Sequence, residues 1–142
     1  MNGKVLTFYL CGILCGIDVI RAKEMNRNVE YTPVPGASNE IAGLMNLRGQ
    51  IITLFDITTI LGFSRMDKRR EMNCIILKAR PHDSDQAGFF IDKTGDVIEV
   101  TADMCEALPA NLGNIERRLI REVVKLEDNI LLVLDLDKIF GT

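Results

Sequence analysis

Hydrophobic residues along the chain fall in short runs that are separated by polar residues, Gly and Pro. The clearest pair of runs covers residues 41–47 and 51–55, which flank the polar residues Arg48 and Gly49. Short runs rich in Ile, Leu and Phe, joined by a Gly-containing turn, are typical of the two strands of a hairpin. The pattern therefore predicts a β-hairpin with Arg48 at its tip.

Similar runs predict further strands on both sides of this hairpin. The first extended segment is Val5–Cys11, and a turn at Gly12 leads to a second that starts at Cys15 and continues towards Met25. The connector Thr32–Gly36 cannot be helical, because Pro pushes the residue before it to extended geometry. Later strands are expected at residues 73–79, 88–92, 96–100, 120–126 and 130–134.

Two short helices interrupt the strand pattern. Asp56 is a candidate N-cap for a helix over 57–61 that ends at Gly62, because Asp accepts hydrogen bonds from the first helical amides and Gly adopts the left-handed C-terminal conformation. Asp135 stands in the same relation to a second helix over 136–140. The chain is therefore predicted to be mainly β.

Residues 41–62 align without gaps against residues 120–141. Both segments contain a hairpin, an Asp that caps a short helix and a closing Gly. We interpret them as two copies of a small barrel-like unit, which pack together because each holds little core alone. Chance similarity between two apolar hairpins is the alternative. Identical pairs are Ile41/Ile120, Leu47/Leu126, Ile51/Ile130, Asp56/Asp135, Ile60/Ile139 and Gly62/Gly141.

The two copies differ at the hairpin tip, where Arg48, Gly49 and Gln50 face residues 127–129, which read Glu-Asp-Asn. A feature that both copies share is required by the fold, whereas a feature of one copy is free to serve function. An ordinary turn accommodates either set, so Arg48 is a candidate recognition group. A solvated charge that keeps the hairpin soluble is the alternative.

The composition is that of an ordinary globular protein, with 142 residues of which 47% are apolar and 26% charged. This length suits one domain. No apolar run approaches the roughly 20 residues that cross a bilayer, so direct membrane insertion is not expected. The N-terminal segment lacks the features of a signal peptide, and the expected location is the cytoplasm.

The net charge of −3 and the 6% content of aromatic residues argue against a nucleic-acid partner. Such a protein would be expected to gather basic residues on one face, with aromatic side chains for stacking. The one basic run, residues 68–70, lies in the loop-like stretch 64–72 and is interpreted as solvated surface. A barrel that binds single-stranded nucleic acid is therefore disfavoured.

The four cysteines are Cys11, Cys15, Cys74 and Cys105, and His82 is the only histidine. They form no C-x-x-C pair, whereas zinc requires four convergent nitrogen or sulfur ligands. Small buried core residues are therefore the preferred interpretation. A thiol or metal enzyme built on these side chains is the alternative from a different class.

The segment Ala42–Ile57, with N-L-R-G followed by I-I-T-L-F-D-I, resembles the pattern of the CheW family of chemotaxis coupling proteins. C-G-I-D-V-I-R-A-K-E-M at residues 15–25 is similar to that family's Y-G-I-x-I-x-x-V-x-E-I. T-P-V-P at residues 32–35 resembles its T-x-V-P connector, and the likeness runs from about Val5 to Phe140. Similar segments of the second half are residues 90–92, 96–98 and 134–140.

The resemblance implies a mainly β fold of two small five-stranded SH3-like β-barrels that share an apolar interface, with short helices. It implies a single CheW-like domain over 1–142, with strand groups near 15–72 and 73–142 and an N-terminal strand that can cross between them. It also implies an adaptor, not an enzyme, with no metal or cofactor.

The partners that the resemblance implies are the cytoplasmic tip of a chemoreceptor and the regulatory domain of a CheA-type histidine kinase. A coupling protein of a non-flagellar pathway, such as pilus motility or gene regulation, is the alternative within the same class. No sequence feature separates these two.

The resemblance further implies which residues form a protein-binding surface. Arg48, with Asn46 and Gly49 beside it, matches the N-L-R-G motif, and Glu24 matches the acid of V-x-E-I. A bidentate bridge between the Arg48 guanidinium and the Glu24 carboxylate is expected to fix the hairpin tip against the neighbouring strand.

Val19, Ala22 and Met25 match apolar residues of the family's receptor-facing groove, which takes a helix. Cys15 stands where an aromatic residue is common and Ala22 where Val is common, which predicts a shallower groove or a receptor tip with larger side chains. From the residues alone, the alternative places Glu24 on a solvent-facing strand surface and Val19 and Met25 in the core.

Overall fold

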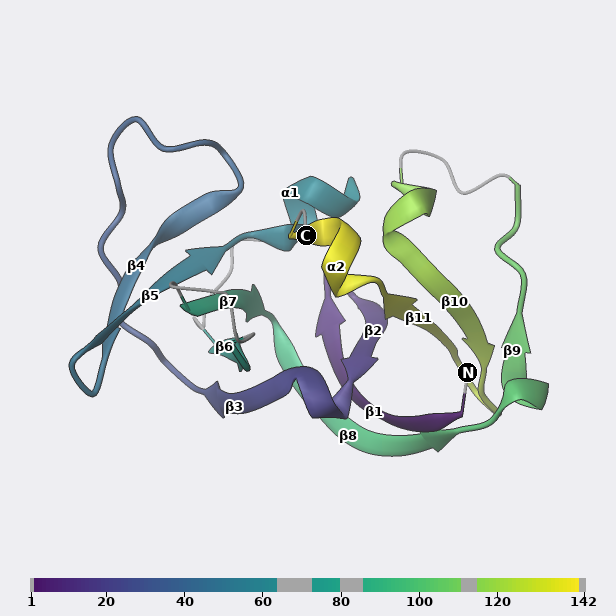
Figure 1. Ribbon diagram of the computed structural model, residues 1–142. Coiled ribbons are helices and arrows are strands. Elements are labelled where there is room, and N and C mark those ends of the chain that lie inside the picture. Colours follow the sequence, from purple (N-terminus) through teal and green to yellow (C-terminus); the bar gives the residue numbers. More distant parts are fainter. Residues whose placement is uncertain (1, 64–72, 80–85, 111–114, 141–142) are drawn as a thin grey trace.

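The computed structural model describes residues 2–63, 73–79, 86–110 and 115–140. Two β-sheets make up most of this part of the chain, and a few short helices lie between and beside them (Figure 1). The mainly β fold expected from the sequence is therefore confirmed. The stretch 64–72 and His82 lie outside the described residues.

The six-stranded sheet has the strand order β8-β1-β2-β11-β10-β9. Its neighbours are antiparallel except β2 and β11, which run parallel. The strands are β1 (Gly3–Leu10), β2 (Ile13–Asp18), β8 (Lys93–Val100), β9 (Cys105–Glu106), β10 (Ile120–Lys125) and β11 (Ile130–Leu134).

The five-stranded sheet has the order β3-β6-β7-β5-β4, again with one parallel pair, β5 and β7. Strands β3 and β4 are its two edges, and the described residues contain no ladder between them. Closure into a barrel therefore stays a prediction. The strands are β3 (Ala22–Asn26), β4 (Ile41–Leu47), β5 (Gln50–Phe55), β6 (Asn73–Leu77) and β7 (Gln86–Ile91).

The two sheets do not divide the chain at residue 72. Strands within 73–91 pair with strands of the first half, and β1 and β2 pair with strands of the second half. This exchange depends on the parallel pairs β2/β11 and β5/β7, whose strands are distant in sequence. The observed grouping is thus 22–55 with 73–91, and 3–18 with 93–134. A division into two barrel subdomains stays a prediction.

Both copies of the predicted repeat fold in the same way. Each hairpin shifts its register just after its first residue, Ile41 in β4 and Ile120 in β10. The strand after each turn then runs parallel to a glycine-bearing strand, so that Leu54 pairs with Gly88 and its counterpart Val133 pairs with Gly16. The shared irregularities support a true repeat over chance similarity.

The short helices also follow the prediction. Helix α1 (Ile57–Leu61) begins after Asp56, whose Oδ1 accepts a hydrogen bond from the Thr58 amide at 3.2 Å, and ends at Gly62 in the left-handed conformation. Helix α2 (Leu136–Ile139) begins after Asp135 in the same manner. It ends one residue before the expected Phe140. The 3₁₀ turns are η1 (Val19–Arg21), η2 (Ala102–Met104) and η3 (Arg117–Leu119).

The largest hydrophobic cluster lies between the sheets and takes side chains from both of them and from both helices. Phe8 of β1 packs on Phe89 of β7 with ring centroids 5.4 Å apart, and Phe55 of β5 packs on Phe140 at 5.1 Å. This cluster is the shared apolar interface that was expected. Two smaller hydrophobic clusters each consist mainly of side chains from one sheet.

Candidate protein-interaction site

The tip of the β4–β5 hairpin is a two-residue turn. Leu47 pairs with Gln50, and the residues between them have positive φ angles of 49° at Arg48 and 83° at Gly49. Two positive φ angles define a type I′ turn, which prefers Asn followed by Gly. The side chain of Asn46 closes the turn, because its Oδ1 accepts a hydrogen bond from the Gly49 amide at 3.0 Å. Asn46 and Gly49 therefore shape the tip.

Arg48 is an unfavourable residue for this turn. A left-handed conformation costs a residue with a Cβ atom about 1 kcal/mol, and Arg has no short polar side chain to offset that cost locally. The equivalent tip of the other copy carries no positive φ angle. Strain of this kind concentrates at functional sites, which supports a recognition role for Arg48.

The predicted bridge between Arg48 and Glu24 is present. Nη2 of Arg48 lies 2.7 Å from Oε1 of Glu24, with one nitrogen–oxygen contact in place of the expected two. The contact joins the hairpin tip beside edge strand β4 to the other edge strand, β3. Arg48 is 67% exposed and Glu24 26% exposed. An ion pair this open contributes at most about 1 kcal/mol to folding, so both groups remain accessible to a partner.

The apolar residues that the sequence assigned to the groove lie on either side of Glu24. Val19 and Ala22 are half-buried, and Ala22 also packs against the main core cluster. Met25 is 37% exposed and pairs with Ile75, on the face of β3 that also carries Ala22, which pairs with Leu77. Glu24 pairs with Ile76 on the other face, because the register shifts between Ala22 and Glu24. The structure thus places Val19, Ala22, Glu24 and Met25 close together along the chain without gathering them on one face, and it excludes Met25 from the core.

Two exposed apolar residues near Arg48 were missed by sequence reasoning. Leu44 of β4 is 36% exposed and Ile51 of β5 is 58% exposed, and Ile51 lies directly opposite Asn46. Alternation along the strand predicts that one of Ile51 and Ile52 points outward, but both are apolar, so the sequence does not say which; in the structure Ile52 is fully buried. Leu44 and Ile51 extend the site across the outer face of the hairpin.

A groove of about 460 Å³ occupies the equivalent place on the other copy, at the tip of the β10–β11 hairpin. Its apolar floor includes Val123, Leu126 and Ile130, which align with Leu44, Leu47 and Ile51 of the first copy. Its charged rim differs. Acidic residues predominate there, namely Glu106, Glu127 and Asp128 beside a single Lys125.

The cysteines do not gather into a reactive centre. Cys15 and Cys74 are fully buried, and burial raises the pKa of both thiols, that of Cys74 to about 11. None of the four cysteines forms a disulfide, and the residues that the structure describes contain no group of three or more His, Cys, Asp or Glu placed to hold a metal. Low thiolate content disfavours nucleophilic chemistry at Cys15 and Cys74.

These features define a class: a mainly β protein of two sheets joined through an apolar seam, with accessible charged and apolar groups at its hairpin tips. No helix in the described part of the chain is long and apolar enough to cross a membrane. The model of the CheW-like domain family matches residues 4–142, and the chain belongs to that family.

Named relatives agree with this membership. The chain is 28% identical over 136 residues to the chemotaxis protein CheW of Thermotoga maritima, covering 96% of this chain and 86% of the relative. It is 27% identical over 132 residues to CheW of Bacillus subtilis, covering 93% and 83%. The crystal structure of the scaffolding protein TtCheW from Thermoanaerobacter tengcongensis superposes with a TM-score of 0.82 at 25% identity, covering 100% of this chain and 90% of that one.

Proposed function

We propose that this chain is a chemotaxis signal-transduction adaptor, which couples the cytoplasmic tip of a chemoreceptor to the regulatory domain of a CheA-type histidine kinase. The family match over residues 4–142 carries the proposal, because relatives that share nearly the whole chain are named chemotaxis protein CheW. The proposed role needs no active site. It places the protein in the cytoplasm, at the membrane-distal tip of the receptors.

Two surfaces that differ in charge support binding to more than one protein. The first is the Arg48–Glu24 tip with exposed Leu44 and Ile51, and the second is the acidic groove at the β10–β11 tip. Each combines an apolar centre with a charged rim, which is the usual arrangement of a protein–protein interface. The first carries one positive and one negative side chain and the second is acidic, so the two favour different partner surfaces, since complementary potentials select the partner and the register.

The β3 side of the first surface suits the receptor tip. Val19 and Ala22 are half-buried apolar residues that lie within five residues of Glu24 along the chain. A helical bundle presents rows of apolar and charged side chains. An apolar surface with charged residues at its edge is complementary to one of those rows. Arg48, Glu24, Val19, Ala22 and Met25 are proposed to contact the receptor, and Met25 is the most exposed of the apolar residues among them.

The experiment is an affinity pull-down with purified full-length protein from the source organism's own pathway. The baits are the kinase regulatory domain alone, a soluble receptor-tip fragment alone, and both together. We expect binding to each bait and a ternary complex with both. If the protein binds neither the kinase domain nor the receptor-tip fragment, the adaptor function is refuted.

A further inference from the structure

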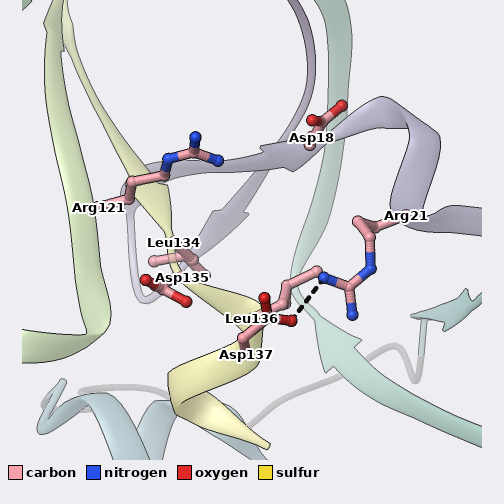
Figure 2. Close-up of a pocket in the computed structure, with 7 residues that line it drawn as sticks. All are labelled: Asp18, Arg21, Arg121, Leu134, Asp135, Leu136 and Asp137. Atoms are coloured by element: carbon pink, nitrogen blue, oxygen red, sulfur yellow. Dashed lines mark hydrogen bonds and ion pairs between the residues drawn. The ribbon is translucent and has the colours of Figure 1, made fainter. Parts of the chain in front are cut away.

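A polar cavity of about 310 Å³ lies where the two sheets meet (Figure 2). One wall comes from the end of β2 and from η1, which leads into the five-stranded sheet. The other wall comes from β10, β11 and α2 of the six-stranded sheet. The lining residues are Asp18, Arg21, Arg121, Leu134, Asp135, Leu136 and Asp137.

One ion pair crosses this cavity. Nη1 of Arg21 in η1 lies 2.8 Å from Oδ1 of Asp137 in α2 (Figure 2). The backbone of the turn is held as well, because Oδ1 of Asp18 accepts from the Ile20 amide at 3.2 Å and the Arg21 carbonyl accepts from the Lys78 amide at 2.9 Å. The side chain of Arg21 thus adds a link from η1 to the other sheet.

The turn that this ion pair holds carries much of the proposed receptor-facing surface. Val19 opens η1 and Ala22 follows it. Ile20, between them, is 64% exposed, the highest value among the large apolar side chains that the structure describes. Folding buries little of the apolar area of such an isoleucine, so most of that area remains for a partner to bury.

We propose that Arg21 is a positioning residue: its ion pair with Asp137 fixes η1, so that Val19, Ile20 and Ala22 meet a receptor helix as one preformed apolar surface. The inference rests on the proposed function and deepens it by naming the contact that sets the geometry of the surface. Preformed surfaces bind more tightly, because the ordering entropy is lost on folding and not on association.

The exposure of the pair separates positioning from global stability. Arg21 is 27% exposed and Asp137 53% exposed, so solvent screens their attraction and the fold depends little on it. The charge of Arg21 matters more to the local conformation of η1 than to the stability of the whole fold. Two Arg and three Asp give the cavity lining a net charge of −1, and loss of Arg21 would leave Asp137 without its ion-pair partner and Arg121 as the remaining cation beside three carboxylates.

The test compares Arg21→Gln with Arg121→Gln. Arg121 lines the same cavity and carries the same charge, but in the described part of the chain it makes no ion pair to η1. Binding is measured by calorimetry with a soluble chemoreceptor-tip fragment from the source organism. We expect Arg21→Gln to weaken binding about tenfold and Arg121→Gln less than about twofold, with melting temperatures of both within a few degrees of the wild type.

A charge swap, Arg21→Glu with Asp137→Arg, provides the second arm. We expect the swap to recover binding relative to Arg21→Glu alone, and the Ile20 amide to exchange its hydrogen faster in Arg21→Gln than in the wild type. Wild-type binding retained by Arg21→Gln, or equal losses in Arg21→Gln and Arg121→Gln, would overturn the positioning role alone. Absence of wild-type binding would refute the proposed function together with this inference.

Discussion

Arg48 and Glu24 belong to opposite edges of the five-stranded sheet, and their side chains meet at 2.7 Å. Strands β6, β7 and β5 separate the two edges in the hydrogen-bonded order. A charged contact therefore joins edges that the described strand pairing leaves apart. Because Arg48 is largely exposed, the same guanidinium can exchange its partner for a carboxylate on another protein.

The first prediction concerns the loss of this pair. Arg48→Ala or Glu24→Ala should weaken binding of the receptor tip or kinase domain by about tenfold or more, since charged anchors beside apolar contacts are frequent hot spots. The free energy of unfolding should change by less than about 1 kcal/mol, because the pair is open to solvent. Calorimetry and thermal melting measure the two quantities.

A double-mutant cycle on binding shows whether the two residues act together. We expect the effect of Glu24→Ala to be smaller in an Arg48→Ala background, and the reversed pair Arg48→Glu with Glu24→Arg to recover part of the binding. Additive losses would mean that the residues act independently. If either single variant unfolds, the ion pair is required for folding and its role in binding is not supported.

A second prediction follows from the turn conformation. Arg48→Asn should raise the free energy of unfolding by about 0.5 to 1 kcal/mol relative to Arg48→Ala, because Asn tolerates the φ angle of 49° that position 48 adopts. Both variants lose the guanidinium, so both should lose binding. Denaturant unfolding compares the two proteins, and equal stabilities would show that the turn holds no strain at Arg48.

The local elements of this molecule could be predicted from its sequence because their signals are local. The hairpin around Arg48 and Gly49 and the helix between Asp56 and Gly62 have the predicted bounds within a residue, since a turn glycine and a capping carboxylate act on the residues next to them. The motif match further placed Glu24 beside Arg48, which no local signal does.

Sheet membership could not be predicted in the same way. Strands β2 and β11 pair in parallel although more than a hundred residues lie between them, and no turn chemistry records such a pairing. Each sheet therefore combines strands from both sides of residue 72, a mixing that the local pattern does not indicate. The outward side of β5 was also hidden, because Ile51 and Ile52 are both apolar and only tertiary packing decides which one is buried.

A third prediction tests that outer face. Ile51→Ser should weaken partner binding severalfold with little change in melting temperature, because the side chain is 58% exposed in the free protein. Val97→Ser is the matched control, since Val97 is 50% exposed on β8 of the other sheet. If both variants bind as the wild type does, the hairpin face is not part of the interface.

A fourth prediction concerns the thiols and pH. At pH 8 a thiol reagent should modify Cys15 and Cys74 only after unfolding, because burial keeps both side chains protonated. Cys74 ionises near its ordinary pKa of 9.0 when unfolded but near 11 when folded. Between these values the unfolded state binds fewer protons, so the free energy of unfolding should fall as the pH rises from 9 to 11.

Peptide mapping by mass spectrometry identifies the labelled thiols, and denaturant unfolding at several pH values follows the stability. Rapid labelling of Cys15 or Cys74 in the folded protein would contradict the buried assignment. It would also restore the thiol-enzyme alternative.

The most direct test of the adaptor function is kinase output in a reconstituted system. Receptor-bearing membranes and the CheA-type kinase from the source organism are mixed with the wild-type protein or with Arg48→Ala, and kinase autophosphorylation is measured. We expect that the wild-type protein increases receptor-controlled autophosphorylation at least several-fold and that Arg48→Ala does so far less. Kinase activity that is the same without the protein, with the wild type and with Arg48→Ala would contradict the adaptor function.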